Sequence, residues 1–300
     1  MNSRGFIVIY VWTVFTLLYV LLKEVKIRRR ISNVPIFYIN LPEAVDRSAS
    51  VEQSFSKFNL QRVDALSADS VEVQALVNRS QHRSCEWGKL TDDPALLRIV
   101  ACSLSHLKAI SIAYRFTKDY ALIVEDDVVT DLLPFWTMSL EEFFSALPVG
   151  WKIVQLSLTG EPELWSDIYT EWKVKRFPPV LMNSSFWGTV AYAINKSGME
   201  YVLDKYRTLN GFDLSMLPCI NADIHLLKDA VPQGTYFIAT PPLFTFSDGS
   251  SYIRPSSDLE NLSRRFAYLP ETNVGFVHFL SRKFALEWNA LLWRARQARF

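Results

Sequence analysis

The sequence predicts a single α/β domain that follows an N-terminal membrane-spanning helix. Three observations lead to this fold class. One apolar run near the start is long enough to cross a bilayer, strand-like and helix-like segments alternate through the rest of the 300 residues, and no internal repeat or low-complexity linker divides them. With 49% hydrophobic and 14% aromatic residues, the chain can bury the core of one domain of ~250 residues.

The membrane helix is predicted from residues 6–22, which contain no charged side chain. A transmembrane helix needs ~17 to 25 apolar residues. A signal peptide has a shorter apolar region, followed by small residues at a cleavage site. Here the basic run KEVKIRRR follows instead, so we expect an uncleaved anchor between a short tail (1–5) and a basic stalk (23–33).

The side of the membrane on which the body lies stays open. Only Arg4 precedes the apolar run, whereas five basic residues follow it, and positive charge favours the cytoplasmic side. Four N-x-S/T sequons argue for a secretory lumen, the one compartment where they can be glycosylated; they begin at Asn78, Asn183, Asn195 and Asn261. We expect a single-pass membrane protein, with the Golgi or ER lumen favoured if the source is eukaryotic.

Charge and cysteine content exclude two classes of site. The net charge is +1, and residues 1–32 carry six basic groups and one acid, so the body is slightly acidic and does not resemble a nucleic-acid binder. The three cysteines have no CxxC or CxxH spacing, which speaks against structural zinc and allows one disulfide at most.

Strands and helices are expected to alternate through a domain at 34–281. Short apolar runs predict strands, and longer runs with helical periodicity predict helices. Asp46 is the expected N-cap of the first helix, polar segments at 65–94 and 245–265 are expected to be loops, and an amphipathic helix at 282–300 packs on the domain or on the membrane surface. The expected strands are 34–41, 120–125, 150–158, 188–194 and 235–240, and the expected helices are 46–58, 96–117, 196–206 and 215–230.

An acid cluster follows the strand predicted at 120–125. The segment YALIVEDD ends in Glu125, Asp126 and Asp127. Ligands of open α/β sheets bind beyond the carboxyl ends of the strands. Crowded carboxylates there repel one another unless a cation compensates. Mg²⁺ and Mn²⁺ use one or two carboxylates together with phosphate oxygens, which a sugar nucleotide supplies. A solvated surface turn is the alternative, and the buried strand before the acids argues against it.

Five segments, taken in order, resemble glycosyltransferase family 25. FYINLPEAVDR is similar to the family's opening strand and Asp-Arg pair, ACSLSHLKAI to its Cys-x-x-Ser-His segment, and ALIVEDDV to its acidic strand end. WGTVAYAINKSGMEYVL and PPLFTFSDGSSYI are similar to two later segments. The chain departs from the family pattern at Pro42 to Val45, which replace basic residues, and at Ala101, which replaces a glycine.

The resemblance implies a GT-A-like domain with a Rossmann-like mixed sheet. It also implies metal-dependent, inverting transfer of a hexose, most often galactose, from a UDP-sugar to a hydroxyl of a glycan, glycoprotein or lipid-linked acceptor. Mn²⁺ or Mg²⁺ is the expected cofactor. An inactive sugar- or protein-binding scaffold that retains the fold is the alternative, motivated by the altered opening loop.

The resemblance also suggests residue roles. Asp127 and Asp126 are the expected metal ligands, and Asp223 is the candidate base or, equally, a helix N-cap. His106 is either a core histidine or a donor contact. Trp187 offers a stacking face in a matching segment, while the loop around Ser247, Asp248, Gly249 and Ser251 could close over substrate. The expected donor-binding residues are Glu125, Asp126, Asn40, Arg47, Ser105, His106, Trp187 and Gly188.

Overall fold

The computed structural model describes the α/β body of the chain. The described residues are 34–79, 94–130, 132, 139–158, 180–181, 186, 188–214, 226–240 and 242–247. The predicted anchor at 6–22, the C-terminal helix at 282–300 and most of the helix predicted at 215–230 lie outside these residues.

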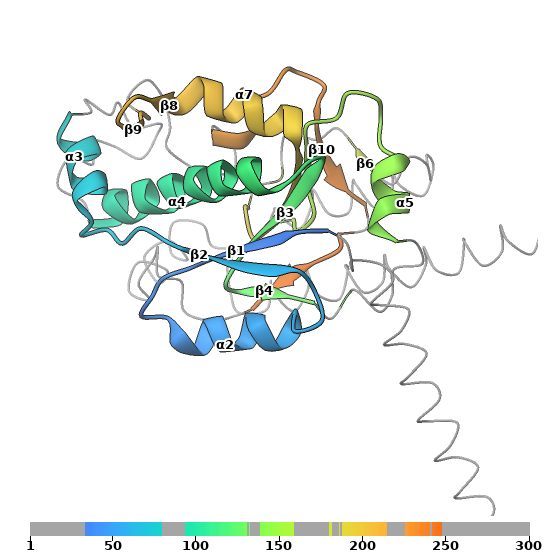
Figure 1. The fold of residues 1–300 in the computed structure, drawn as a ribbon, viewed down its shortest axis with the longest axis horizontal. Coiled ribbons are helices and arrows are strands. Elements are labelled where there is room, and N and C mark those ends of the chain that lie inside the picture. Colours follow the sequence, from blue (N-terminus) through green and yellow to red (C-terminus); the bar gives the residue numbers. More distant parts are fainter. Residues whose placement is uncertain are drawn as a thin grey trace, which may run out of the picture.

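The described part of the chain alternates strands and helices, as the sequence predicts (Figure 1). The strands of the main sheet are β1 (Ile36–Asn40), β2 (Leu60–Asp64), β3 (Tyr120–Glu125), β5 (Ile153–Gln155), β6 (Val180–Leu181), β7 (Ala191–Asn195) and β10 (Tyr236–Ala239). Two small antiparallel sheets pair β4 (Val128–Val129) with β11 (Thr245–Phe246) and β8 (Arg207–Thr208) with β9 (Gly211–Phe212). The helices are α2 (Val45–Ser54), α3 (Val71–Arg79), α4 (Pro94–Phe116), α5 (Leu140–Ser145) and α7 (Lys196–Tyr206).

The main sheet has seven strands in the order β2-β1-β3-β7-β5-β10-β6. β1 is parallel to β2 and β3, and β5 is parallel to β10. β7 is antiparallel to both of its neighbours, β3 and β5, and β6 is antiparallel to β10. The carboxyl ends of β1, β2, β3, β5 and β10 therefore meet at one edge, together with the amino end of β7. This mixed, largely parallel sheet fits the predicted Rossmann-like class.

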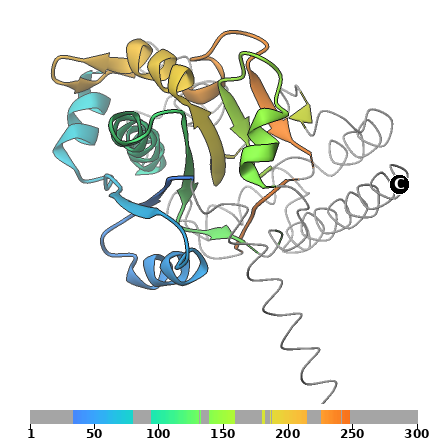
Figure 2. The same ribbon diagram turned by 45° about the vertical axis from the view of Figure 1, so that its right-hand side comes forward.

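Two apolar cores lie on opposite faces of the sheet. Along β1, Phe37 and Ile39 face the core under α4 and α7, whereas Ile36 and Tyr38 face the core under α2. Strands buried on both faces read as continuous apolar runs, which is why YALIV shows no alternation. Figure 2 shows α4 nearly end-on, on the opposite side of the sheet from α2.

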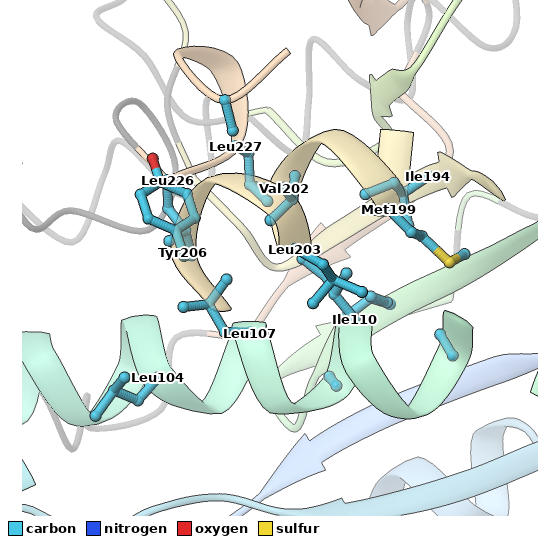
Figure 3. Close-up of a cluster of buried hydrophobic side chains, with 14 of the residues drawn as sticks. Leu104, Leu107, Ile110, Ile194, Met199, Val202, Leu203, Tyr206, Leu226 and Leu227 are labelled. Carbon is cyan, nitrogen blue, oxygen red and sulfur yellow. The ribbon is translucent and has the colours of Figure 1, made fainter. Parts of the chain in front are cut away.

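The helix pair α4 and α7 forms the larger core (Figure 3). Leu107 and Ile110 of α4 lie beside Leu203 and Tyr206 of α7 in the same apolar cluster. Within the described residues, the segment Leu97–Phe116 is long and apolar enough to cross a membrane. Its buried side chains pack on the sheet and on α7, which identifies it as a core helix of this domain.

Helix α7 matches the predicted range and is fixed closely to the sheet. Its N-cap, Asn195, accepts a hydrogen bond from Gly198 N at 2.7 Å and donates to Trp151 O. A Cβ at Gly198 would lie 2.6 Å from Lys152 O, so only glycine allows this approach. Because its amide is used inside the fold, Asn195 is not available for glycosylation in the folded chain.

Several expected boundaries were wrong. Asp46 is not the N-cap of α2: Ala44 takes that position without a side-chain bond, and Asp46 lies in the first turn, where an acid still favours the helix dipole. The segment expected as a loop at 65–94 contains α3, whose Val73 and Leu76 are buried at helical spacing. Likewise, β11 lies inside the loop expected at 245–265.

Candidate functional site

The three acids lie at the carboxyl end of the central strand, as the sequence predicts. Glu125 is the last residue of β3, and Asp126 and Asp127 form the turn that leads into β4. β4 pairs with β11, and Ser247 N donates to Asp127 O at 2.9 Å. Residues 245–247 are therefore hydrogen-bonded beside the acid turn, although they follow it by more than a hundred residues in the sequence.

Asp126 is tied to the opening strand and the first helix. Asn40 Nδ2, at the end of β1, donates to Asp126 Oδ2 at 2.8 Å, and Arg47 Nη1, from α2, donates to Asp126 Oδ1 at 2.8 Å. The side chain of Arg47 is 22% exposed and that of Asp126 12%. The structure thus brings together three of the predicted site residues, and it joins them to one another. Both oxygens of Asp126 are already in charge-assisted hydrogen bonds.

Glu125 turns to the face of the sheet that α4 covers. Thr189 Oγ1 donates to Glu125 Oε1 at 2.5 Å, and His106 Nε2 lies 3.5 Å from the same oxygen. Burial alone would raise the pKa of Glu125, but His106, Thr189 and Arg47 together outweigh it and lower the pKa below its usual value. Glu125 is therefore held as a carboxylate.

Asp127 has the opposite environment. Its Oδ1 is buried and has no hydrogen-bond partner among the described residues. Burial, followed by repulsion from Glu125 and Asp126, raises the pKa of Asp127 to about 7, while Arg47 lowers it. Uncompensated burial of a carboxylate oxygen is costly. Asp126 contacts Arg47 and Glu125 contacts His106, whereas Oδ1 of Asp127 has no such partner among the described residues.

Ser105 and His106 lie in the middle of α4, beneath the sheet edge. Ser105 Oγ donates to Ala101 O at 2.6 Å and accepts from Leu66 N at 2.8 Å. Both bonds go to backbone, so the hydroxyl fixes the loop after β2 to α4. His106 is completely buried, and its Nδ1 lies 3.2 Å from Tyr192 OH. Their predicted contacts with a donor stay predictions.

Gly188 lies at the same edge, just before β7. Its φ of +103° is a left-handed conformation that favours glycine. Its carbonyl accepts from Gln155 Nε2 at 2.8 Å, and Tyr236 OH donates to Gln155 Oε1 at 3.2 Å. The predicted base Asp223 and the predicted stacking residue Trp187 lie outside the described residues, as do Asp248, Gly249 and Ser251.

Two contacts of the site were not predicted from the sequence. Thr189 reaches Glu125 because β7 is antiparallel, so the residues before that strand meet the residues after β3. Tyr192 lies on the same face as His106. A usable signal in the sequence was the polar residue Thr189 just before the run AYAI, but it indicates a position at this edge only once the direction of β7 is known.

The residues around Asp127 fit a divalent cation that completes its coordination with ligand oxygens. In the part of the chain that the structure describes, no three His, Cys, Asp or Glu side chains converge as a full metal site. Mg²⁺ and Mn²⁺ do not need such a cage, since one or two carboxylates and substrate phosphates suffice. The unpartnered Asp127 Oδ1 supplies one ligand of this kind.

Comparison with known proteins supports the resemblance drawn from the sequence. The family described as glycosyltransferase family 25 (LPS biosynthesis protein) matches residues 33–146, which include β1, α4, β3 and the acid turn. No curated protein sequence matches the chain significantly. The family match indicates a glycosyltransferase, with a sugar donor and an acceptor as its substrates.

Proposed function

We propose, starting from the match to glycosyltransferase family 25 over residues 33–146, that the protein is a metal-dependent, inverting hexosyltransferase. Its donor is a UDP-sugar, with UDP-galactose as the first candidate, and its acceptor is a hydroxyl of a glycan, glycoprotein or lipid-linked sugar. The observation that carries the metal dependence is the buried, unpartnered Oδ1 of Asp127 at the carboxyl edge of the sheet.

Asp127 is the proposed metal ligand, with Mn²⁺ or Mg²⁺ as the ion. The cation would balance the negative charge of the donor diphosphate and of the leaving UDP. Asp126 was the second predicted ligand. Its bonds to Asn40 and Arg47 make it first a support for the turn, although each carboxylate oxygen retains a second lone pair.

The chain's own groups would carry the rest of the reaction. A carboxylate, for which Asp223 is the candidate, would accept the proton of the acceptor hydroxyl. The acceptor oxygen would form a bond to the anomeric carbon as the bond from that carbon to the diphosphate oxygen breaks, and UDP would leave on the opposite face. Attack in line with the leaving group inverts the anomeric configuration.

The membrane anchor is part of the proposal. Residues 6–22 would hold the body at a membrane by a single span. Extraction of membranes with alkaline carbonate tests this: an anchored chain stays in the pellet, and a chain released into the supernatant would refute the span.

Calorimetric titration tests the donor site. UDP-galactose is titrated into the full-length chain in detergent, with Mn²⁺ and with EDTA, alongside Asp127→Ala. We expect binding that requires both the metal and Asp127, and donor hydrolysis that requires the metal. If the folded chain binds neither UDP-galactose, UDP-glucose nor UDP, the metal-site proposal fails and the inactive scaffold is favoured. UDP-glucose binding alone would replace the donor and leave the site intact.

A further inference from the structure

Four side chains lie one after another beneath the acid turn, on the α4 face of the sheet, with a hydrogen bond at each end and a looser contact between Glu125 and His106 in the middle. Thr189 Oγ1 donates to Glu125 Oε1 at 2.5 Å. His106 Nε2 lies 3.5 Å from that same oxygen, and His106 Nδ1 lies 3.2 Å from Tyr192 OH. The members come from α4, β3, β7 and the residues before β7, so they join a helix to two neighbouring antiparallel strands.

Three members of this set of contacts are buried, and the fourth, Glu125, is partly exposed. His106 and Tyr192 are at most 1% exposed, and Thr189 is buried too. The Glu125 side chain is 22% exposed. Oε1 takes both contacts. The protein thus fixes the carboxylate through one oxygen, which makes Oε2 the candidate contact for a group at the sheet edge.

The orientation of the His106 ring follows from charge. A bare Nε2 lone pair facing a carboxylate oxygen in a buried site would be repulsive, so Nε2 carries a hydrogen. At 3.5 Å the contact is longer than a well-formed hydrogen bond, and Nε2 has no hydrogen-bond partner among the described residues, so its interaction with Glu125 is electrostatic. Complete burial beneath Glu125 leaves His106 no surface with which to touch a substrate.

We propose that His106 is a positioning residue, which together with Thr189 and Tyr192 holds the Glu125 carboxylate in one orientation so that Oε2 meets the sugar nucleotide. The part of this statement that concerns the nucleotide rests on the proposed function. The part that concerns the carboxylate does not, and the two are tested separately.

The orientation of the ring is tested without substrate. The chain contains four histidines, and with ¹⁵N-histidine labelling the His106 signal is assigned by its loss in His106→Gln. We expect the ¹⁵N shift of a hydrogen-bearing Nε2, and a change in this shift in Glu125→Gln. A bare Nε2, or no response to Glu125→Gln, would overturn the proposal whether or not the protein binds a donor.

A matched pair of variants tests the positioning role. Glutamine places its amide nitrogen where His106 Nε2 lies, whereas asparagine places it near Nδ1 and offers Glu125 no donor. We expect His106→Asn to lower kcat/KM for UDP-galactose by about 10- to 100-fold, and His106→Gln to recover most of that loss. Equal losses in both variants would indicate a packing role and overturn the proposal.

Thr189 provides an independent arm in case the His106 variants fold poorly. Thr189→Val removes the donor to Glu125 without changing shape, and Thr189→Ser restores it. Thr117→Val is the control, since Thr117 is equally buried, its hydroxyl donates to Ala113 O, and it directly follows the C-terminal end of α4, away from the acid turn. We expect Thr189→Val to lower kcat/KM and Thr189→Ser to restore it, with little change in the control. Unchanged kcat/KM in Thr189→Val, at unchanged Tm, would contradict the inference.

Discussion

Arg47 of α2 and Asp126 of the acid turn form an ion pair, with 2.8 Å between Arg47 Nη1 and Asp126 Oδ1. The pair spans 79 residues of sequence and joins the first helix of the domain to the end of its central strand. Asn40 reinforces it from β1. The positive charge of Arg47 acts beyond Asp126, because it also offsets part of the rise in the pKa of Asp127.

Replacing Arg47 is expected to weaken both the fold and the metal site. Arg47→Ala leaves Asp126 without its ion pair, and we expect it to lower the free energy of unfolding by about 1 to 3 kcal/mol. It also raises the pKa of Asp127 further, so Mn²⁺ binding should require a higher pH.

Arg62→Ala is the matched control for this change. Its pair with Asp64 has a similar distance, 3.0 Å, but the two side chains are 34% and 62% exposed. Exposed pairs contribute ~0 to 1 kcal/mol. Chemical denaturation of both variants, with Mn²⁺ titrations at several pH values, provides the comparison. Equal effects of the two substitutions would show that the Arg47 pair has no special role.

Asp127→Asn is expected to stabilise the metal-free protein at pH 8. The raised pKa of Asp127, about 7 against an ordinary 3.8, means that the folded state binds this proton more tightly than the unfolded state. The contribution of Asp127 to stability therefore falls as pH rises from about 4 to 7 and is lowest above 7. Asparagine mimics the protonated form, so it should recover about 1 to 3 kcal/mol at pH 8 and nothing near pH 4.

Thermal or chemical unfolding of wild type and Asp127→Asn with EDTA, from pH 4 to 8, measures this difference. Asp119→Asn is the control, because Asp119 is an exposed acid beside the same strand. A stability difference that stays constant across the pH range would show that the Asp127 carboxyl is not the group responsible.

The affinity for Mn²⁺ in the presence of UDP is expected to rise with pH up to about 7 and then level off. Below that value a proton competes with the metal for Asp127, whose pKa is raised to about 7. Calorimetry between pH 5.5 and 8 would show this dependence. An affinity that does not change below pH 7 would exclude Asp127 as the titrating ligand.

Gly198→Ala is expected to destabilise the domain without altering the site chemistry directly. The added Cβ would meet Lys152 O at 2.6 Å, so α7 must shift from the sheet at a cost of about 1 to 3 kcal/mol. Gly150→Ala is the comparison: φ there is +83° but nothing lies within 4 Å, so only the backbone conformation is strained. A Gly198→Ala protein as stable as wild type would show that α7 can shift away from Lys152 O without a cost in stability.

The predictions from sequence succeeded where apolar runs decide the structure. The run YALIV predicts a strand buried on both faces, and β3 lies between β1 and β7 in the middle of the sheet. The helix at 196–206 has its predicted bounds because Asn195 provides an N-cap. In contrast, β2 was missed and α3 was expected as loop, since among the side chains whose burial the structure describes β2 buries Val63 alone and α3 buries Val73 and Leu76. Local patterns are weak where few side chains face the core.

By itself, the sequence determined the α/β class, the family resemblance and the position of three acids at a strand end, because these depend on local apolar patterns and on motifs that stand in order. Only the tertiary structure decided the environment of each acid. Asp126 faces Asn40 and Arg47, Glu125 faces Thr189 and His106, and Asp127 retains an unpartnered oxygen. The partners come from distant segments, and the antiparallel direction of β7 brings Thr189 to this edge. Since burial and neighbouring charge set the pKa of a carboxyl group, adjacent acids that look alike in sequence acquire different chemistry only in the folded chain.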